Sequence, residues 1–205
     1  MSMNAQAAAE QSGKRHPALQ TFIDQCRAVW AGGDDTGVCM ERCLPHLEEI
    51  TRDADLQKRS EEWPSTEGRK NLLLYVDPDY GFAINAVVRV PGRQGSVHDH
   101  GHVWVAYGVL TGTESLERYE RTDDRSRELY AELRLTGVGD GKPGKVDLVP
   151  PFDIHSEKGG PTRSTAIILR SGKLGEVIQH QYNMETGAMV PGPGPTQIPF
   201  ELEAR

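Results

Sequence analysis

The sequence predicts a domain with an all-β core behind a short helical segment. From about residue 70 onward, short apolar runs are separated by Gly, Pro and Asp at spacings of about 10 residues, which is typical of an antiparallel sandwich or barrel. Before that point, apolar side chains recur at steps of three and four, the period of an amphipathic helix. The length of 205 residues suits one such domain with a helical appendage.

The helical segment follows a small, polar N-terminus, residues 1–13, which we expect to be disordered. A first helix is predicted over residues 17–33, where two glycines end the apolar pattern. A second apolar run, residues 38–50, contains Pro45 and forms either one kinked helix or two short ones. Residues 14–62 are therefore expected to form a helical prefix.

The predicted β-domain covers residues 63–185. The apolar runs that we interpret as strands are NLLLYVD, FAINAVVRV, VWVAYGVL, ESLERYER, ELYAELRL, KVDLVP, STAIILRS and EVIQHQYN. Turn residues such as Pro91-Gly92 separate them. The tail, residues 186–205, is rich in Pro and Gly, and we expect it to drape over the domain without joining a β-ladder.

The composition argues against several classes of protein. A net charge of −7 disfavours nucleic-acid binding, because phosphate contacts need clustered Lys and Arg. No apolar run approaches the roughly 20 residues that span a bilayer, and no secretory signal is evident, so we expect a cytoplasmic protein. The three cysteines fit a reducing compartment and are interpreted as small buried side chains, with a metal pair of Cys39 and Cys43 as the alternative.

Three of the seven histidines lie within five residues, at His98, His100 and His102. Alternate side chains of a strand point to the same face, so His98 and His100 can present two imidazoles to one metal ion. His102 joins them if the strand stays regular. If Gly101 bends the chain, His102 instead lies beside the ligands and donates a hydrogen bond. A fourth candidate, His155, follows 55 residues after His100.

The paired histidines lie in a regular frame. Gly92 is followed by five residues, His98-x-His100, four residues, Val105, six residues and Gly112. This spacing resembles the first motif of the cupin family, with Val105 in place of the usual Glu.

A second frame surrounds His155. Gly144, five residues, Pro150 and then His155 resemble the second cupin motif. The resemblance implies a cupin fold, which is a double-stranded β-helix (jelly-roll) barrel with a metal inside one mouth. Because the Glu is missing, it implies a neutral ligand set of His98, His100 and His155, which leaves positions open for substrate and dioxygen.

The chain from about Arg69 to Arg170 is similar to the cysteine dioxygenase (thiol dioxygenase) family. In that family a basic residue and two strands lead into HDH, a Trp and a GxLxG segment, and HDHGHVWVAYGVLTG has this order. The resemblance implies a mononuclear Fe(II) site that oxidises a small anionic thiol, cysteine or a mercapto acid, to a sulfinate with O2. Neutral imidazoles do not cancel the charge on Fe(II), so the open face attracts the thiolate.

Five residues are candidates beside the ligands. The resemblance places a basic residue for the substrate carboxylate at Lys70 or Arg69. Thiol dioxygenases usually carry Ser, His and Tyr on the strand after the third ligand, and here Arg170 lies near the Tyr position. Arg170 is thus a candidate substrate anchor, or alternatively an edge arginine in an ion pair. Tyr107 is expected to line the pocket mouth, and His102 to serve as a catalytic group.

Two other functions remain open. The same site suits a three-histidine cupin dioxygenase that cleaves a C–C bond of a diketone or an aromatic acid, and it suits a non-catalytic cupin that binds a metal or small ligand. The expected partners are a small-molecule substrate and O2, with no nucleic acid and no membrane, and the expected assembly is a monomer or homodimer.

Overall fold

The computed structural model describes residues 15–172 and 177–204. The expectation of disorder in residues 1–13 lies outside this part of the chain. The first helix, α2, extends over Pro17–Trp30 and buries one face, as its periodicity predicts. None of the helices in the described ranges is long and apolar enough to cross a membrane.

The second apolar run forms one helix, α3, over Thr36–Thr51 with Pro45 inside it, so the alternative of two short helices is wrong. A further helix, α4, covers Ala54–Ser60 and is capped by Asp53, whose side chain accepts a hydrogen bond from the Leu56 N–H. Its seven residues are too few to produce a clear periodic pattern, and the sequence did not indicate it. The three cysteines lie buried on α2 and α3.

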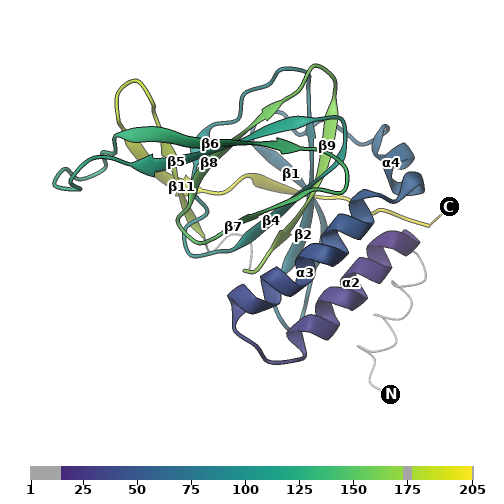
Figure 1. Ribbon diagram of the computed structural model, residues 1–205. Coiled ribbons are helices and arrows are strands. Elements are labelled where there is room, and N and C mark those ends of the chain that lie inside the picture. Colours follow the sequence, from purple (N-terminus) through teal and green to yellow (C-terminus); the bar gives the residue numbers. More distant parts are fainter. Residues whose placement is uncertain (1–14, 173–176, 205) are drawn as a thin grey trace.

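The described strands form two six-stranded sheets (Figure 1). The first sheet has the order β12 (Thr196–Pro199), β1 (Lys70–Val76), β2 (Ala83–Arg89), β9 (Ser164–Arg170), β4 (Val105–Thr111), β7 (Val146–Val149). The second has the order β11 (Met189–Pro193), β10 (Ile178–Tyr182), β3 (Val97–His98), β8 (Ile154–Gly159), β5 (Glu114–Arg121), β6 (Leu133–Gly141). Strands distant in sequence are thus neighbours, as in a jelly roll. This order confirms the predicted all-β core and its double-stranded β-helix arrangement.

The two faces of the first sheet meet different surroundings, because side chains alternate along each strand. Helices α2 and α3 lie side by side on its outer face (Figure 1), where Ile84 and Leu169 belong to the apolar cluster under the helices. Val87, Tyr107 and Ile168 point the other way, into a second cluster inside the barrel. Strands β2 and β9 are therefore buried on both sides, which explains their nearly unbroken apolar runs.

The C-terminal tail departs from expectation, because it contributes two strands to the ladders. β11 pairs antiparallel with β10, and β12 pairs parallel with β1. Both strands lie at sheet edges, where a proline that lacks an N–H can be tolerated because one side of the strand needs no partner. The prediction that Pro and Gly exclude a ladder was therefore wrong for this segment.

Candidate metal centre

The structure brings three of the predicted ligands together at one end of the barrel. His98 ends β3 and lies directly opposite His155 of β8, and His100 follows two residues after the end of β3. The ring centroids of His98 lie 4.7 Å from His100 and 4.4 Å from His155, and the remaining pair is 4.8 Å apart. One ring nitrogen from each residue lies within 4.8 Å of the other two, so the three-histidine group is suited to hold a metal ion.

Hydrogen bonds direct two of these rings. The Nδ1 atoms of His98 and His155 lie 2.9 Å and 3.2 Å from the carbonyl oxygens of Ser96 and Asp153. Each ring donates its Nδ1 hydrogen there, because a carbonyl only accepts, and the Nε2 lone pair is left free. Among the described residues the buried Nε2 of His155 has no hydrogen-bond partner. An orphaned lone pair of this kind fits a site that holds a metal ion.

The surroundings keep the imidazoles of His98 and His100 neutral. Burial, and then the neighbouring His155, lower the pKa of His98 to about 4. Burial, followed by the positive charge of Arg170, lowers the pKa of His100 well below its usual value. A neutral imidazole is the form that ligates a metal, and His98, whose Nδ1 hydrogen is donated to Ser96, has its Nε2 lone pair available at neutral pH.

The Nδ1 atom of His100 faces side chains from two other strands. It is hydrogen-bonded to the amide of Gln179, which is 4 % exposed, and it lies 3.3 Å from Nη1 of Arg170. Gln179 was not among the predicted site residues. The sequence feature that could have indicated it is the alternate spacing of Gln179 and Gln181 along β10, because both side chains line the same cavity.

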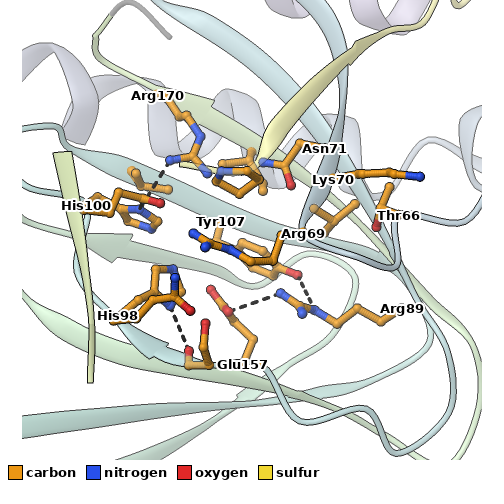
Figure 2. Close-up of a pocket in the computed structure, with 18 of the residues that line it drawn as sticks. Thr66, Arg69, Lys70, Asn71, Arg89, His98, His100, Tyr107, Glu157 and Arg170 are labelled. Carbon is orange, nitrogen blue, oxygen red and sulfur yellow. Dashed lines mark hydrogen bonds and ion pairs between the residues drawn. The ribbon is translucent and has the colours of Figure 1, made fainter. Parts of the chain in front are cut away.

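Predicted substrate-binding residues line a cavity of about 100 Å³ beside the histidines. Arg69, Lys70, Tyr107 and Arg170 all contribute to its wall. Figure 2 shows the side chain of Arg69 extending toward the histidines, whereas Lys70 points away from them. Of the two basic residues left open by the sequence, Arg69 is therefore the one placed to meet a ligand.

Arg170 is a buried cation with no ion pair to any of the described residues. It is 7 % exposed, its Nε atom has no hydrogen-bond partner among the described residues, and none of their carboxylates pairs with it. Burial lowers its pKa to about 10, which still leaves it charged at neutral pH. The alternative of an edge arginine in an ion pair is wrong. An unpaired guanidinium at this depth favours an anionic ligand in the cavity.

A buried ionic network forms another wall, and the sequence did not reveal it. Arg89 lies 3.1 Å from both Glu114 and Glu157. The hydroxyl of Tyr107 donates a hydrogen bond of 2.8 Å to Glu114. Tyr107 is only 3 % exposed and lies inside the barrel rather than at the pocket mouth.

His102 lies outside the cavity, which corrects its prediction as a catalytic group. The strand β3 ends at His98, and Gly101 has a φ of +56°, so the alternation of side chains does not continue. His102 is exposed and does not line the cavity.

Asp99 lies between His98 and His100 in the sequence, and its side chain anchors this segment. Its carboxylate accepts hydrogen bonds from the backbone N–H of Gly101 at 2.8 Å and from the hydroxyl of Tyr182 at 2.7 Å, and it lies 3.0 Å from Nδ1 of His180. Asp99 is 2 % exposed. These contacts tie the segment to β10 and so position His98 and His100.

Comparison with known proteins gives similarity at the level of structure. No protein-family model and no curated protein matches the chain. Similar solved structures include the Schizosaccharomyces pombe Cnp3 cupin domain, with 15 % identity and a TM-score of 0.39 over 50 % of this chain and 64 % of that one. An oxalate oxidase in complex with the substrate analogue glycolate has 15 % identity and a TM-score of 0.41, over 55 % of this chain and 56 % of its own.

An uncharacterized conserved protein with a double-stranded β-helix domain from Klebsiella pneumoniae subsp. pneumoniae has 15 % identity and a TM-score of 0.41, with coverage of 60 % of this chain and 93 % of its own. The chain therefore spans less than two thirds of the Cnp3 domain and of the oxalate oxidase. Cupin-domain proteins are among the structures to which it is similar.

Proposed function

We propose that this protein is a mononuclear non-haem Fe(II) dioxygenase that oxidises a small anionic thiol, cysteine or a mercapto acid, to a sulfinate. One observation carries the proposal: three clustered imidazoles lie beside the buried guanidinium of Arg170, which pairs with no carboxylate of residues 15–172 and 177–204. The imidazoles suit a divalent ion, and the guanidinium suits the carboxylate of a substrate bound next to that ion.

His98, His100 and His155 are the residues that would hold the ion. Bound Fe(II) would supply open coordination positions and the capacity to exchange electrons with dioxygen. Nitrogen ligands alone also suit Zn, Ni and Mn, so iron is preferred because of the O2 chemistry proposed. Two neutral rings leave the charge of the ion largely uncancelled, which favours a thiolate over a thiol.

The remaining wall of the cavity orients the substrate. Arg170 binds the substrate carboxylate in two parallel hydrogen bonds, and Arg69 attracts anions from the cavity mouth. Val105 and Ile168 add apolar surface to the cavity wall, which would help to exclude water from a bound thiolate. In the overall reaction RS⁻ and O2 give RSO2⁻. The sulfur loses four electrons, dioxygen gains them, and no other reductant is needed.

Oxygen uptake by the iron-loaded protein tests this proposal. A panel of mercapto acids, diketones and aromatic acids is offered, and the products are separated by mass. We expect uptake with mercapto acids and a product heavier by two oxygen atoms. Cleaved carbon products would instead support the C–C dioxygenase, and metal binding without any uptake would support a non-catalytic cupin.

A further inference from the structure

A second guanidinium lines the cavity that Arg170 enters. Arg170 ends β9, and Arg69 directly precedes β1, so the two side chains come from different strands of the first sheet. The guanidinium of Arg69 donates a hydrogen bond of 3.1 Å to the carbonyl of Pro193, and no carboxylate in the described part of the chain pairs with it. A neutral carbonyl does not balance a positive charge. Two guanidiniums without a described carboxylate partner therefore border one small space.

The backbone of Arg69 has a conformation that residues with a side chain rarely adopt. Its φ is +58°, in the left-handed region, and it follows Gly68 at +76°. The carbonyl of Arg69 accepts a hydrogen bond of 2.9 Å from the N–H of Thr196, which ties this turn to β12. A glycine would suit the same turn without strain. Strain of this kind is typical of positions where the side chain serves a site, so it favours a ligand-binding role for the guanidinium.

A buried amide in the same wall lacks an acceptor. Asn71 of β1 is 3 % exposed, it lines the cavity, and its Nδ2 atom has no hydrogen-bond partner within residues 15–172 and 177–204. Figure 2 shows Asn71 on the same side of the cavity as Arg170. A buried donor without a partner costs free energy, and an acceptor oxygen of a ligand would remove that cost.

The charge around the cavity is mostly positive although the whole chain has a net charge of −7. The one lining carboxylate among the described residues, Glu157, lies 3.1 Å from Arg89 and is matched by it. The other charged residues of the wall are cations that pair with no described carboxylate: Arg69, Lys70, Arg93 and Arg170. Such a field favours a ligand with more than one negative charge.

We propose that the substrate is a mercapto acid with two carboxylates. The inference rests on the proposed function and narrows its substrate class. Each guanidinium presents a planar fork that matches both oxygens of one carboxylate, so two guanidiniums match two carboxylates. Arg170 binds the carboxylate nearer the histidines, and Arg69 binds the other together with Asn71. Cysteine fits this wall less well, because its ammonium adds a positive charge. The step at sulfur is unchanged, since RS⁻ and O2 again give RSO2⁻.

Three thiols that differ only in their carboxylates test the inference. Mercaptobutanedioate carries two, whereas 3-mercaptopropionate and 2-mercaptopropionate each lack one of them, and cysteine is added for comparison. We expect kcat/KM for oxygen uptake by the iron-loaded protein to be at least about 10-fold higher for mercaptobutanedioate than for the others. Calorimetric titration of the metal-free chain with succinate and propionate measures the carboxylate site without any chemistry. We expect succinate to bind more tightly by a similar factor.

A variant of Arg69 assigns the preference to its side chain. We expect Arg69→Gln to reduce the preference for mercaptobutanedioate over the better monocarboxylate to less than about 3-fold, because the second carboxylate loses its partner. The matched control Lys70→Gln removes the same charge from a side chain that points away from the histidines. It should keep most of the preference, since an exposed charge acts only through a screened field. If circular dichroism shows that Arg69→Gln does not fold, Arg69→Gly replaces it, because glycine suits the positive φ.

The outcomes separate this inference from the proposed function. Equal kcat/KM values for the three thiols, or a higher value for cysteine, would overturn the inference and leave the dioxygenase in place. An unchanged preference in the Arg69 variant would also overturn it, as would an equal loss in Lys70→Gln. Absence of oxygen uptake with every thiol would overturn the proposed function, and tighter binding of succinate than of propionate would then still support a site for two carboxylates.

Discussion

Arg170 illustrates how one side chain joins stability to function. A buried guanidinium that pairs with no carboxylate in the described part of the chain destabilises the barrel, and a bound anion relieves that cost. The position of Arg170 at the end of β9, opposite Ala83 and Val105 on the flanking strands, holds it in the layer of the histidines. Its side chain therefore has little freedom to reach water.

We expect Arg170→Ala to raise KM for the thiol substrate about 10–100-fold, with a smaller effect on kcat. A charge-assisted hydrogen bond contributes about 1.5–3 kcal/mol, and the bond is made in the ground state as well as the transition state. Steady-state kinetics of the iron-loaded enzyme measure both constants. Arg170→Lys should recover only part of the loss because Lys lacks the planar fork. Unchanged kinetics in Arg170→Ala would make the residue merely structural.

The ligand assignment is tested one histidine at a time. We expect His155→Ala to weaken metal binding by more than about 100-fold, since changes to residues that only support a ligand already cost 10–100-fold. Metal analysis after dialysis measures the content. His102→Ala is the matched control and should retain the ion, because this histidine is exposed and outside the cavity. Stoichiometric iron in His155→Ala would remove His155 from the ligand set.

At the scale of elements, Asp77 connects the β1–β2 turn to helix α2. Its side chain is fully buried, pairs with Arg27 and accepts hydrogen bonds from the N–H groups of Asp79 and Tyr80 and from the hydroxyl of Tyr75. Burial alone would raise the pKa of Asp77, but these donors outweigh it and hold the pKa below its usual value. The charged carboxylate is therefore part of the fold.

We expect Asp77→Asn to lower the free energy of unfolding by about 2–4 kcal/mol, since it leaves buried donors and a cation without their partner. The control Asp79→Asn, at an exposed position that also pairs with Arg27, should cost less than about 1 kcal/mol.

The stability that Asp77 contributes should also depend on pH. The folded pKa of Asp77 lies below the unfolded one, so its contribution to the free energy of unfolding is complete above about pH 4 and is lost as the pH falls through the folded value. Urea denaturation at pH 7 and near pH 3 should show that the free energy of unfolding falls less with pH in Asp77→Asn than in the wild type.

Helix α3 approaches the barrel closely at Gly108 of β4. A Cβ atom on Gly108 would lie 2.8 Å from Cγ2 of Thr51 and 3.2 Å from Cγ of Leu47. We expect Gly108→Ala to destabilise the protein by about 1–3 kcal/mol, because the helix must move. Gly137→Ala, on β6 with no atom within 4 Å of the added carbon, should stay within about 0.5 kcal/mol. Equal unfolding midpoints in urea for the two variants would contradict the tight contact.

At the scale of the whole molecule, metal binding should stabilise the folded barrel. An ion present at 100 times its Kd adds about 2.7 kcal/mol, because only the folded chain assembles the site. For a chain of 205 residues this corresponds to a rise of about 5–10 °C in Tm. Differential scanning calorimetry with and without Co(II) measures the shift. The same rise in His155→Ala would show that the ion stabilises the protein elsewhere.

Much of the fold was predictable because its signals are local. The period of residues 17–30 and the turn residues between the apolar runs depend only on neighbours in sequence. Strand β8 and the edge strands β11 and β12 escaped prediction. The inner face of β8 carries His155 and Glu157, so the strand lacks an apolar alternation, and its polar groups are matched by Arg89, 68 residues away. The edge strands β11 and β12 form only because an edge of each sheet is free to pair with them, and this cannot be read from their own residues.

The sequence by itself determined the helical prefix, the all-β core and the spacing of His98, His100 and His155, because these patterns depend only on the order of residues along the chain. Only the tertiary structure decided that Arg170 is buried with no carboxylate partner among the described residues, that His102 is exposed, and that Glu157 lies against His155. The physical reason is that burial and charge pairing depend on strands that are distant in the chain and adjacent in the sheet.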